Sequence, residues 1–129
     1  MKAAFDSEQF EKLSGMALGR YVVEFSKEGE LPVNFFDYFK SNVGRWDGQH
    51  LEMALSLLRK IDTNAAKHEI ANHLIHPLKY IRLTTLSFID QFDAIDGYVL
   101  SKIEESLQCA TEEFELQWLK QLQKKATKS

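Results

Sequence analysis

The histidines of the central segment come nearest, by type and spacing, to residues that could hold a metal ion. Glu69, His73 and His76 stand at i, i+4 and i+7, so a helix would place them on one face, next to His68. The catalytic zinc motif requires two histidines four residues apart with a glutamate after the first, but the residue four positions after His68 is Asn72. The simpler interpretation is a solvated helical face. We therefore expect no metal site and no cofactor, and a metal-dependent enzyme that uses this histidine group stays open as an alternative.

A catalytic cysteine is the second chemistry to consider. Cys109 is the only cysteine, and a nucleophilic thiolate needs a base within hydrogen-bond reach, whereas the histidines are distant in the sequence. Its neighbours Leu107 and Ala110 indicate an ordinary position at a helix end. We expect no enzymatic activity. A chain that can form no internal disulfide, opens without an apolar run and lacks any stretch of roughly 20 apolar residues is typical of a soluble cytoplasmic protein that spans no membrane.

The distribution of charge indicates what kind of partner the chain could bind. Sixteen Lys and Arg residues oppose nineteen Asp and Glu residues, and this net charge of −3 argues against nucleic acid, whose binding needs clustered cations. Residues 90–115 are far more acidic than the rest, with eight acids and one lysine, a local charge of −7. This segment is either a solubilising face or a surface that steers a basic protein toward it. Its acids are Asp90, Asp93, Asp96, Glu104, Glu105, Glu112, Glu113 and Glu115, and its one lysine is Lys102.

One pattern of apolar and polar residues occurs three times in the sequence. In each copy, apolar residues stand at the first, third, fourth and seventh of eight positions, and the copies begin at Leu55, Leu86 and Leu116. Starts separated by 31 and 30 residues are expected when one supersecondary unit is repeated and stacked. Few prolines and glycines, and apolar residues at three- and four-residue intervals, favour helices throughout. The sequence thus predicts an all-α fold of repeated helical hairpins.

The length of 129 residues and the 44% of hydrophobic residues are those of one globular domain. We expect a single domain over residues 1–129, with a first helix from about Ser7 to Ser26 inside an N-terminal capping segment, 1–30. The three hairpins are expected at about 33–61, 63–92 and 96–126. Residues suited to cap the starts of helices are Asp6, Asp47, Thr63, Asp96 and Thr111.

A cluster of aromatic residues lies in the first expected hairpin. Phe35, Phe36, Tyr38 and Phe39 occupy four of five consecutive positions, and 3.6 residues per turn spreads them around a helix. They cannot all point into one core stripe. Either the helix is packed between neighbours, or part of the cluster is exposed for binding, and the sequence leaves both interpretations open.

The segment 69–89 resembles a HEAT-like repeat. In that family a first helix ends at a turn that contains proline, as at His76-Pro77, and the second opens with an aliphatic-arginine pair, as at Ile81-Arg82. Thr85 stands where a small residue usually packs. The resemblance implies a short α-solenoid, or superhelix, of about three HEAT-like hairpins with an N-terminal capping helix.

The same resemblance implies a candidate surface for a protein partner, because the second helices of HEAT-like hairpins line one concave side. The polar pairs of the repeated pattern would stand in register there as a mixed-charge groove. These are Arg59, Lys60, Asp90, Gln91, Lys120 and Gln121. The acids expected to contribute to partner binding beside them are Asp93, Asp96, Glu104, Glu105, Glu112 and Glu113.

In size, acidity and helical build the chain also resembles bacterial immunity proteins, including those paired with contact-dependent toxins. That resemblance implies a non-catalytic inhibitor that masks a basic toxin domain, and a nuclease would suit the acidic segment because carboxylates can occupy sites meant for phosphate. The alternative is an adaptor or subunit of a larger assembly that uses the aromatic cluster as its contact.

Overall fold

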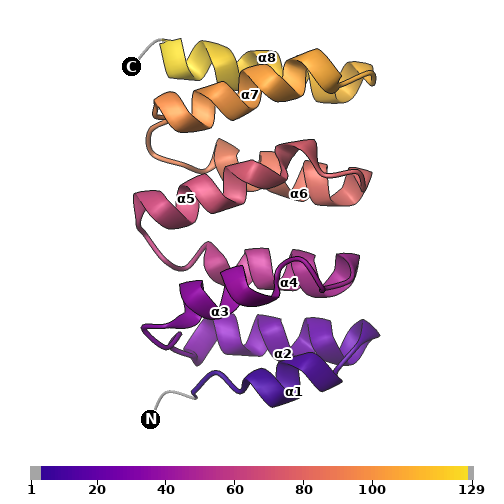
Figure 1. The fold of residues 1–129 in the computed structure, drawn as a ribbon, viewed down its shortest axis with the longest axis vertical. Helices are drawn as coiled ribbons and strands as arrows, with labels where there is room; N and C mark the ends of the chain where they lie inside the picture. Colours follow the sequence, from indigo (N-terminus) through magenta and orange to yellow (C-terminus); the bar gives the residue numbers. More distant parts are fainter. Residues whose placement is uncertain (1–3, 128–129) are drawn as a thin grey trace. The chain divides into compact units, whose positions relative to one another are not determined.

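The computed structural model of the protein describes residues 4–127 and confirms the all-α prediction (Figure 1). Within that range the backbone forms helices and turns, without strands, and its one β-type contact is an isolated bridge between Ala4 and Glu30. The chain divides into two compact units, which we call the first unit (1–61) and the second unit (62–129) and describe separately.

The first unit holds four helices, and α4 packs against both α2 and α3. Apolar side chains from each helix, including Phe10, Leu18, Phe39 and Leu55, are fully buried between them. The helices are α1 (Ser7–Lys12), α2 (Gly15–Glu28), α3 (Phe35–Asn42) and α4 (Gly48–Leu58).

The prediction of one helix from Ser7 to Ser26 is wrong, because the chain breaks between α1 and α2. Leu13 and Ser14 are extended, and Gly15 has a φ of 58°, a left-handed conformation that side chains disfavour and glycine tolerates. A side chain from α4 occupies the break. The Gln49 Oε1 accepts from the Gly15 N–H at 2.9 Å, and the Gln49 Nε2 donates to the Gly15 carbonyl at 2.8 Å.

The aromatic cluster belongs mainly to the core. Phe35 and Phe39 are 1% and 0% exposed, while Tyr38 and Phe36 are half-buried, as the helical period requires. The Phe39 ring lies 5.5 Å from the Trp46 ring, centroid to centroid. Phe35 and Phe39 therefore serve packing, and Phe36 and Tyr38 are the members of the cluster that remain partly accessible.

The second unit consists of two helical hairpins that pack on each other helix by helix. The 3-10 turn η1 continues α5, and together they pack on α6 to form the first hairpin. The second hairpin is formed by α7 and α8. Between the hairpins, α5 contacts α7 and α6 contacts α8 (Figure 1). The elements are α5 (Asn64–Ala71), η1 (Asn72–Ile75), α6 (Lys79–Asp90), α7 (Gly97–Cys109) and α8 (Glu113–Thr127).

Four of the five predicted helix caps are confirmed. Asp6, Asp47, Thr63 and Asp96 each accept a hydrogen bond from a backbone N–H in the first turn. Thr111 is the exception. The Glu112 carbonyl accepts the first bond of α8, from the Leu116 N–H at 3.0 Å, so Glu112 takes the capping position. The three copies of the repeated pattern fall on α4, α6 and α8 and the turns that follow α4 and α6.

Candidate protein-binding site

The histidine group is divided among separate partners. Within residues 4–127, no three His, Cys, Asp or Glu side chains converge as metal ligands would. Burial, together with the nearby charges of His73 and Arg82, lowers the pKa of His76. The observed contacts are His68 Nε2 to Asp96 Oδ2 at 2.6 Å, His73 Nε2 to Glu69 Oε2 at 3.2 Å, and the Leu78 N–H donating to His76 Nδ1 at 3.0 Å.

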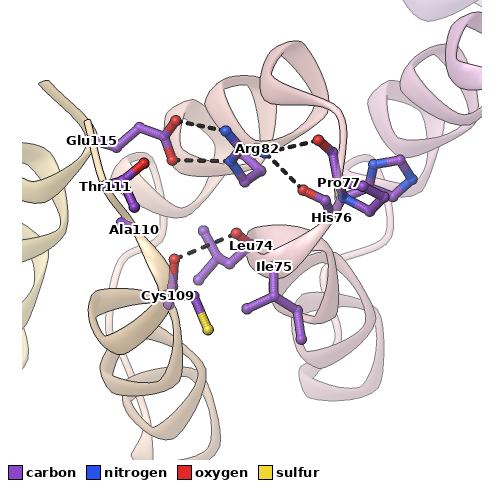
Figure 2. A pocket seen from close by; sticks show the side chains of 10 residues that line it. Leu74, Ile75, His76, Pro77, Arg82, Cys109, Ala110, Thr111 and Glu115 are labelled. Atoms are coloured by element: carbon purple, nitrogen blue, oxygen red, sulfur yellow. Dashed lines mark hydrogen bonds and ion pairs between the residues drawn. The ribbon is translucent and has the colours of Figure 1, made fainter.

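Cys109 lines a cavity of about 250 Å³ whose charged groups bond to one another (Figure 2). The Arg82 Nε and Nη2 donate to the two Glu115 carboxylate oxygens, each at 3.0 Å. The Arg82 Nη1 donates to the carbonyls of His76 and Pro77, also at 3.0 Å each. Figure 2 shows Arg82 lying between Glu115 on one side and these carbonyls on the other. The guanidinium thus joins α6, the turn before it and α8, and we assign the cavity a structural role.

Glu115 does not belong to the acidic surface. Its side chain is 3% exposed and forms a bidentate ion pair with Arg82, 33 residues earlier in the chain. The hydrogen bonds that Arg82 donates to Glu115 raise the pKa of Arg82. A buried carboxylate that is already neutralised cannot attract a partner.

The other seven acids of the segment are exposed, and basic side chains pair with three of them. Burial raises the pKa of Asp96, but hydrogen bonds from the Val99 N–H and from His68 outweigh it and hold that pKa below its ordinary value. A hydrogen bond from Lys79 lowers the pKa of Glu112. The pairs are Asp96 with His68 at 2.6 Å, Glu105 with Lys102 at 3.4 Å, and Glu112 with Lys79 at 2.9 Å.

Four carboxylates have no cationic partner in the described part of the chain, and they do not form one patch. Asp90 and Asp93 lie at the end of α6 and just after it, Glu104 lies on α7, and Glu113 opens α8. The 13 residues of α7 separate the loop before it from the start of α8 by about 20 Å. A continuous run of acids in the sequence therefore becomes several separate sites.

The repeated polar pairs have different local roles. Arg59 and Lys60 belong to the first unit, where both are exposed, and the Lys60 Nζ donates to the carbonyls of Ser26 and Gly29 at 3.0 and 3.2 Å. Lys60 thus caps the end of α2. The remaining members belong to the second unit and are exposed at the end of α6 and along α8. They are Asp90, Gln91, Lys120 and Gln121.

Two of these positions meet in a groove that the sequence did not reveal. The groove has a volume of about 340 Å³ and lies between α6, which contributes Asp90, and one face of α8. We call it the α6–α8 groove. Its α8 residues are Phe114, Gln117, Trp118 and Gln121. The Phe114 and Trp118 rings meet edge to face, with centroids 5.6 Å apart and planes at 77°.

The helical period explains why α8 presents this face. Phe114, Trp118 and Gln121 stand at i, i+4 and i+7, whereas Leu119 and Leu122, which lie on a different face, are buried in the core. Phe114 is 65% exposed. Trp118 occupies the position of the repeated pattern where Leu57 and Phe88 are 0% and 8% exposed, yet Trp118 is only half-buried. A sequence signal existed, since Phe114 stands outside the core stripe and Trp118 is the largest residue at its repeat position.

Carboxylates stand at the groove on both helices. Asp90 is in its wall, and the Glu113 Oε1 accepts from the Nε2 of the groove residue Gln117 at 2.7 Å. An exposed aromatic pair between unpaired carboxylates is suited to binding an apolar and cationic group.

Two further findings concern the helices and the sequence. None of the helices within residues 4–127 has both the length and the apolar character that crossing a bilayer requires. Comparison with known protein families, with curated proteins and with solved structures found no match to this chain.

Proposed function

We propose that this protein is a non-catalytic protein-binding module, and most concretely an immunity-type inhibitor that masks a basic protein domain such as a toxin. The observation that carries the proposal is the α6–α8 groove, where the 65% exposed Phe114 and the half-buried Trp118 lie beside unpaired carboxylates. Aromatic residues are enriched at the energetically dominant positions of protein interfaces. When a partner buries large aromatic side chains that the fold leaves exposed, the complex is stabilised.

Electrostatics supports a basic partner. The unpaired carboxylates of Asp90 and Glu113 flank the groove, and those of Asp93 and Glu104 are exposed elsewhere on the same unit. Complementary charge accelerates association and disfavours acidic competitors. A stable interface covers about 800 Å² on each partner, so the groove would serve as its centre and these further acids as its rim.

A short-solenoid arrangement of the hairpins fits the same proposal. In repeat proteins each unit buries one face on its neighbour and leaves extended faces for partners. The second unit supports this view because its two hairpins contact each other through equivalent helices, α5 with α7 and α6 with α8.

The test is capture from source-cell lysate at low and high salt, followed by affinity measurement with the purified partner. Two variants with equal charge change are compared, Asp90→Lys with Glu113→Lys at the groove, and Glu8→Lys with Glu24→Lys on exposed positions of the first unit. We expect a basic protein that binds the unmodified chain and the control, but not the groove variant. If the partner has toxic activity, adding the protein should inhibit it. Binding that neither reversal changes would contradict the electrostatic basis of the proposal.

A further inference from the structure

We propose that the α6–α8 groove receives an arginine side chain of the partner, with its guanidinium stacked on the Trp118 indole and bonded to the Asp90 carboxylate. The inference rests on the proposed function, because it specifies how the basic partner is recognised.

The aromatic wall favours a planar cation. A guanidinium is weakly hydrated and stacks on aromatic faces, and tryptophan gives the strongest cation–π attraction among the aromatic residues. The edge-to-face contact with Phe114, at 5.6 Å and 77°, fixes the orientation of the Trp118 ring before a partner arrives. A ring that is already held loses little side-chain entropy on binding.

The polar wall supplies acceptors. Asp90 is exposed, and its carboxylate has no cationic partner within residues 4–127. Gln117 donates its amide N–H to Glu113, which leaves the Gln117 carbonyl oxygen available as an acceptor in the groove wall. A guanidinium carries five N–H donors in a fixed fork and can use both acceptors, whereas an ammonium acts as a compact point charge.

A lysine that contacts Asp90 is directed to its backbone. Lys125 donates from its Nζ to the carbonyls of Asp90 and Phe92, at 3.0 and 2.9 Å. Its charge is thereby balanced by the negative end of the α6 dipole rather than by the Asp90 carboxylate. Asp90 therefore presents its backbone oxygen to the protein and its carboxylate to solvent.

The first experiment is an NMR titration of the ¹⁵N-labelled full chain with an octapeptide of alternating glycine and arginine. Matched peptides carry citrulline, lysine or trimethyllysine in place of arginine. We expect the arginine peptide to shift the Trp118 indole N–H and the amides of residues 90 and 114–121. The Trp46 indole N–H, which donates to Glu11 in the first unit, is the internal control and should not move. Loss of the stacking and charge should weaken binding of the citrulline peptide by about fivefold or more.

Three variants locate the site. Asp90→Asn should weaken binding of the arginine peptide by about two- to fivefold, as expected for an exposed charge pair. Trp118→Leu should weaken it by about two- to fivefold through loss of the cation–π contact. Glu104→Gln removes an exposed carboxylate on α7, outside the groove, and should leave binding nearly unchanged. Since Trp118→Leu also changes packing, its helicity is checked by circular dichroism, and Asp90→Asn tests the site without touching the core.

The outcomes separate this inference from the proposed function. Equal binding of the arginine and citrulline peptides, tighter binding of the lysine or trimethyllysine peptide, or shifts confined to α7 overturns the arginine site. Shifts confined to α7 would also remove the groove from the proposed function, which would then rest on the exposed acids of α7 alone. Conversely, if Trp118 responds to the arginine peptide but the captured partner is insensitive to Asp90→Lys with Glu113→Lys, the proposed function fails and the arginine site remains.

Discussion

The two units use aromatic residues in opposite ways. The first unit buries Phe35 and Phe39 almost completely, whereas the second leaves Phe114 65% exposed and Trp118 half-buried. An aromatic side chain that is buried in the core contributes to the free energy of folding. An exposed one contributes instead to the free energy of binding, when a partner covers it. The buried pair contributes to stability, and the exposure of Phe114 and Trp118 is the reason why we propose a binding role for them.

The units also differ in the ionic hub that ties their helices together. In the first unit the hub is Glu11, which accepts from Tyr38, from the Trp46 indole at 2.9 Å and from Arg45 at 3.1 Å. In the second unit the hub is a cation, Arg82, bonded to Glu115 and to two backbone carbonyls. Glu11 is 25% exposed and Glu115 only 3%, so water can compensate for damage to the first hub but hardly for damage to the second.

The largest expected effect tests the aromatic difference. Phe39→Ala should lower the free energy of unfolding by about 3–5 kcal/mol, because it opens a cavity in a fully buried site. Phe114→Ala should change it by less than about 0.5 kcal/mol, since most of that ring already contacts water. Urea denaturation followed by circular dichroism measures both. A comparable loss in the two variants would show that Phe114 belongs to the core and that the groove is not a free surface.

The next effect tests the buried hub. Arg82→Met should cost about 3–5 kcal/mol, because it leaves the Glu115 carboxylate buried without a partner. Arg82→Met combined with Glu115→Leu should recover most of this loss, since no charge then remains to be desolvated. The same denaturation experiment provides the values. If the double variant is no more stable than Arg82→Met, Arg82 stabilises the protein mainly through its hydrogen bonds to the carbonyls of His76 and Pro77, and not through its ion pair with Glu115.

The exposed hub should give a smaller, pH-dependent effect. Burial raises the pKa of Glu11, but hydrogen bonds from Tyr38, Arg45 and Trp46 outweigh it and hold the pKa below its ordinary value. A lowered folded-state pKa adds stability above the unfolded pKa of about 4.3, and that stability disappears as the pH falls through the folded-state pKa. Glu11→Gln should therefore cost about 1–3 kcal/mol at pH 7 and progressively less toward pH 3.

Stability measured at several pH values between 7 and 3 checks this prediction. Glu104→Gln is the control, because that carboxylate is exposed and forms no ion pair within the described residues. A difference between Glu11→Gln and the unmodified protein that stays constant down to pH 3 would show that the Glu11 side chain acts by shape and not by charge.

Periodicity and local capping made the helices predictable. The repeated pattern that begins at Leu55, Leu86 and Leu116 maps onto α4, α6 and α8. Apolar residues at three- and four-residue intervals indicate which face of a helix is buried. Asp47 and Asp96 cap α4 and α7 through bonds to residues three positions later, a distance the sequence displays directly.

At the candidate site, contacts between residues far apart in the chain determine burial, and the sequence does not reveal these contacts. Glu115 looks like a surface acid, and only its pairing with Arg82, 33 residues away, makes it a buried one. Likewise, Phe114 and Trp118 look like ordinary apolar residues of α8, and their exposure depends on how much of that helix α6 and α7 cover. Charge and hydropathy describe a residue's preference, whereas burial depends on what the fold brings against it.

The smallest effect concerns the break between α1 and α2, where the prediction of one continuous helix failed. Gly15→Ala should lower the free energy of unfolding by about 1–2 kcal/mol, because φ of 58° forces an added Cβ into strain although no atom stands in its way. Gly19→Ala, four residues later in α2, should raise it by about 0.5–1 kcal/mol, since alanine stabilises a helix interior and the space beside Gly19 is open. If urea denaturation gives changes of opposite sign in the free energy of unfolding for the two variants, the native backbone has the break at Gly15. A gain in both variants would indicate that the first unit prefers the single helix that its sequence predicts, with the Gln49 bonds to Gly15 too weak to hold the turn.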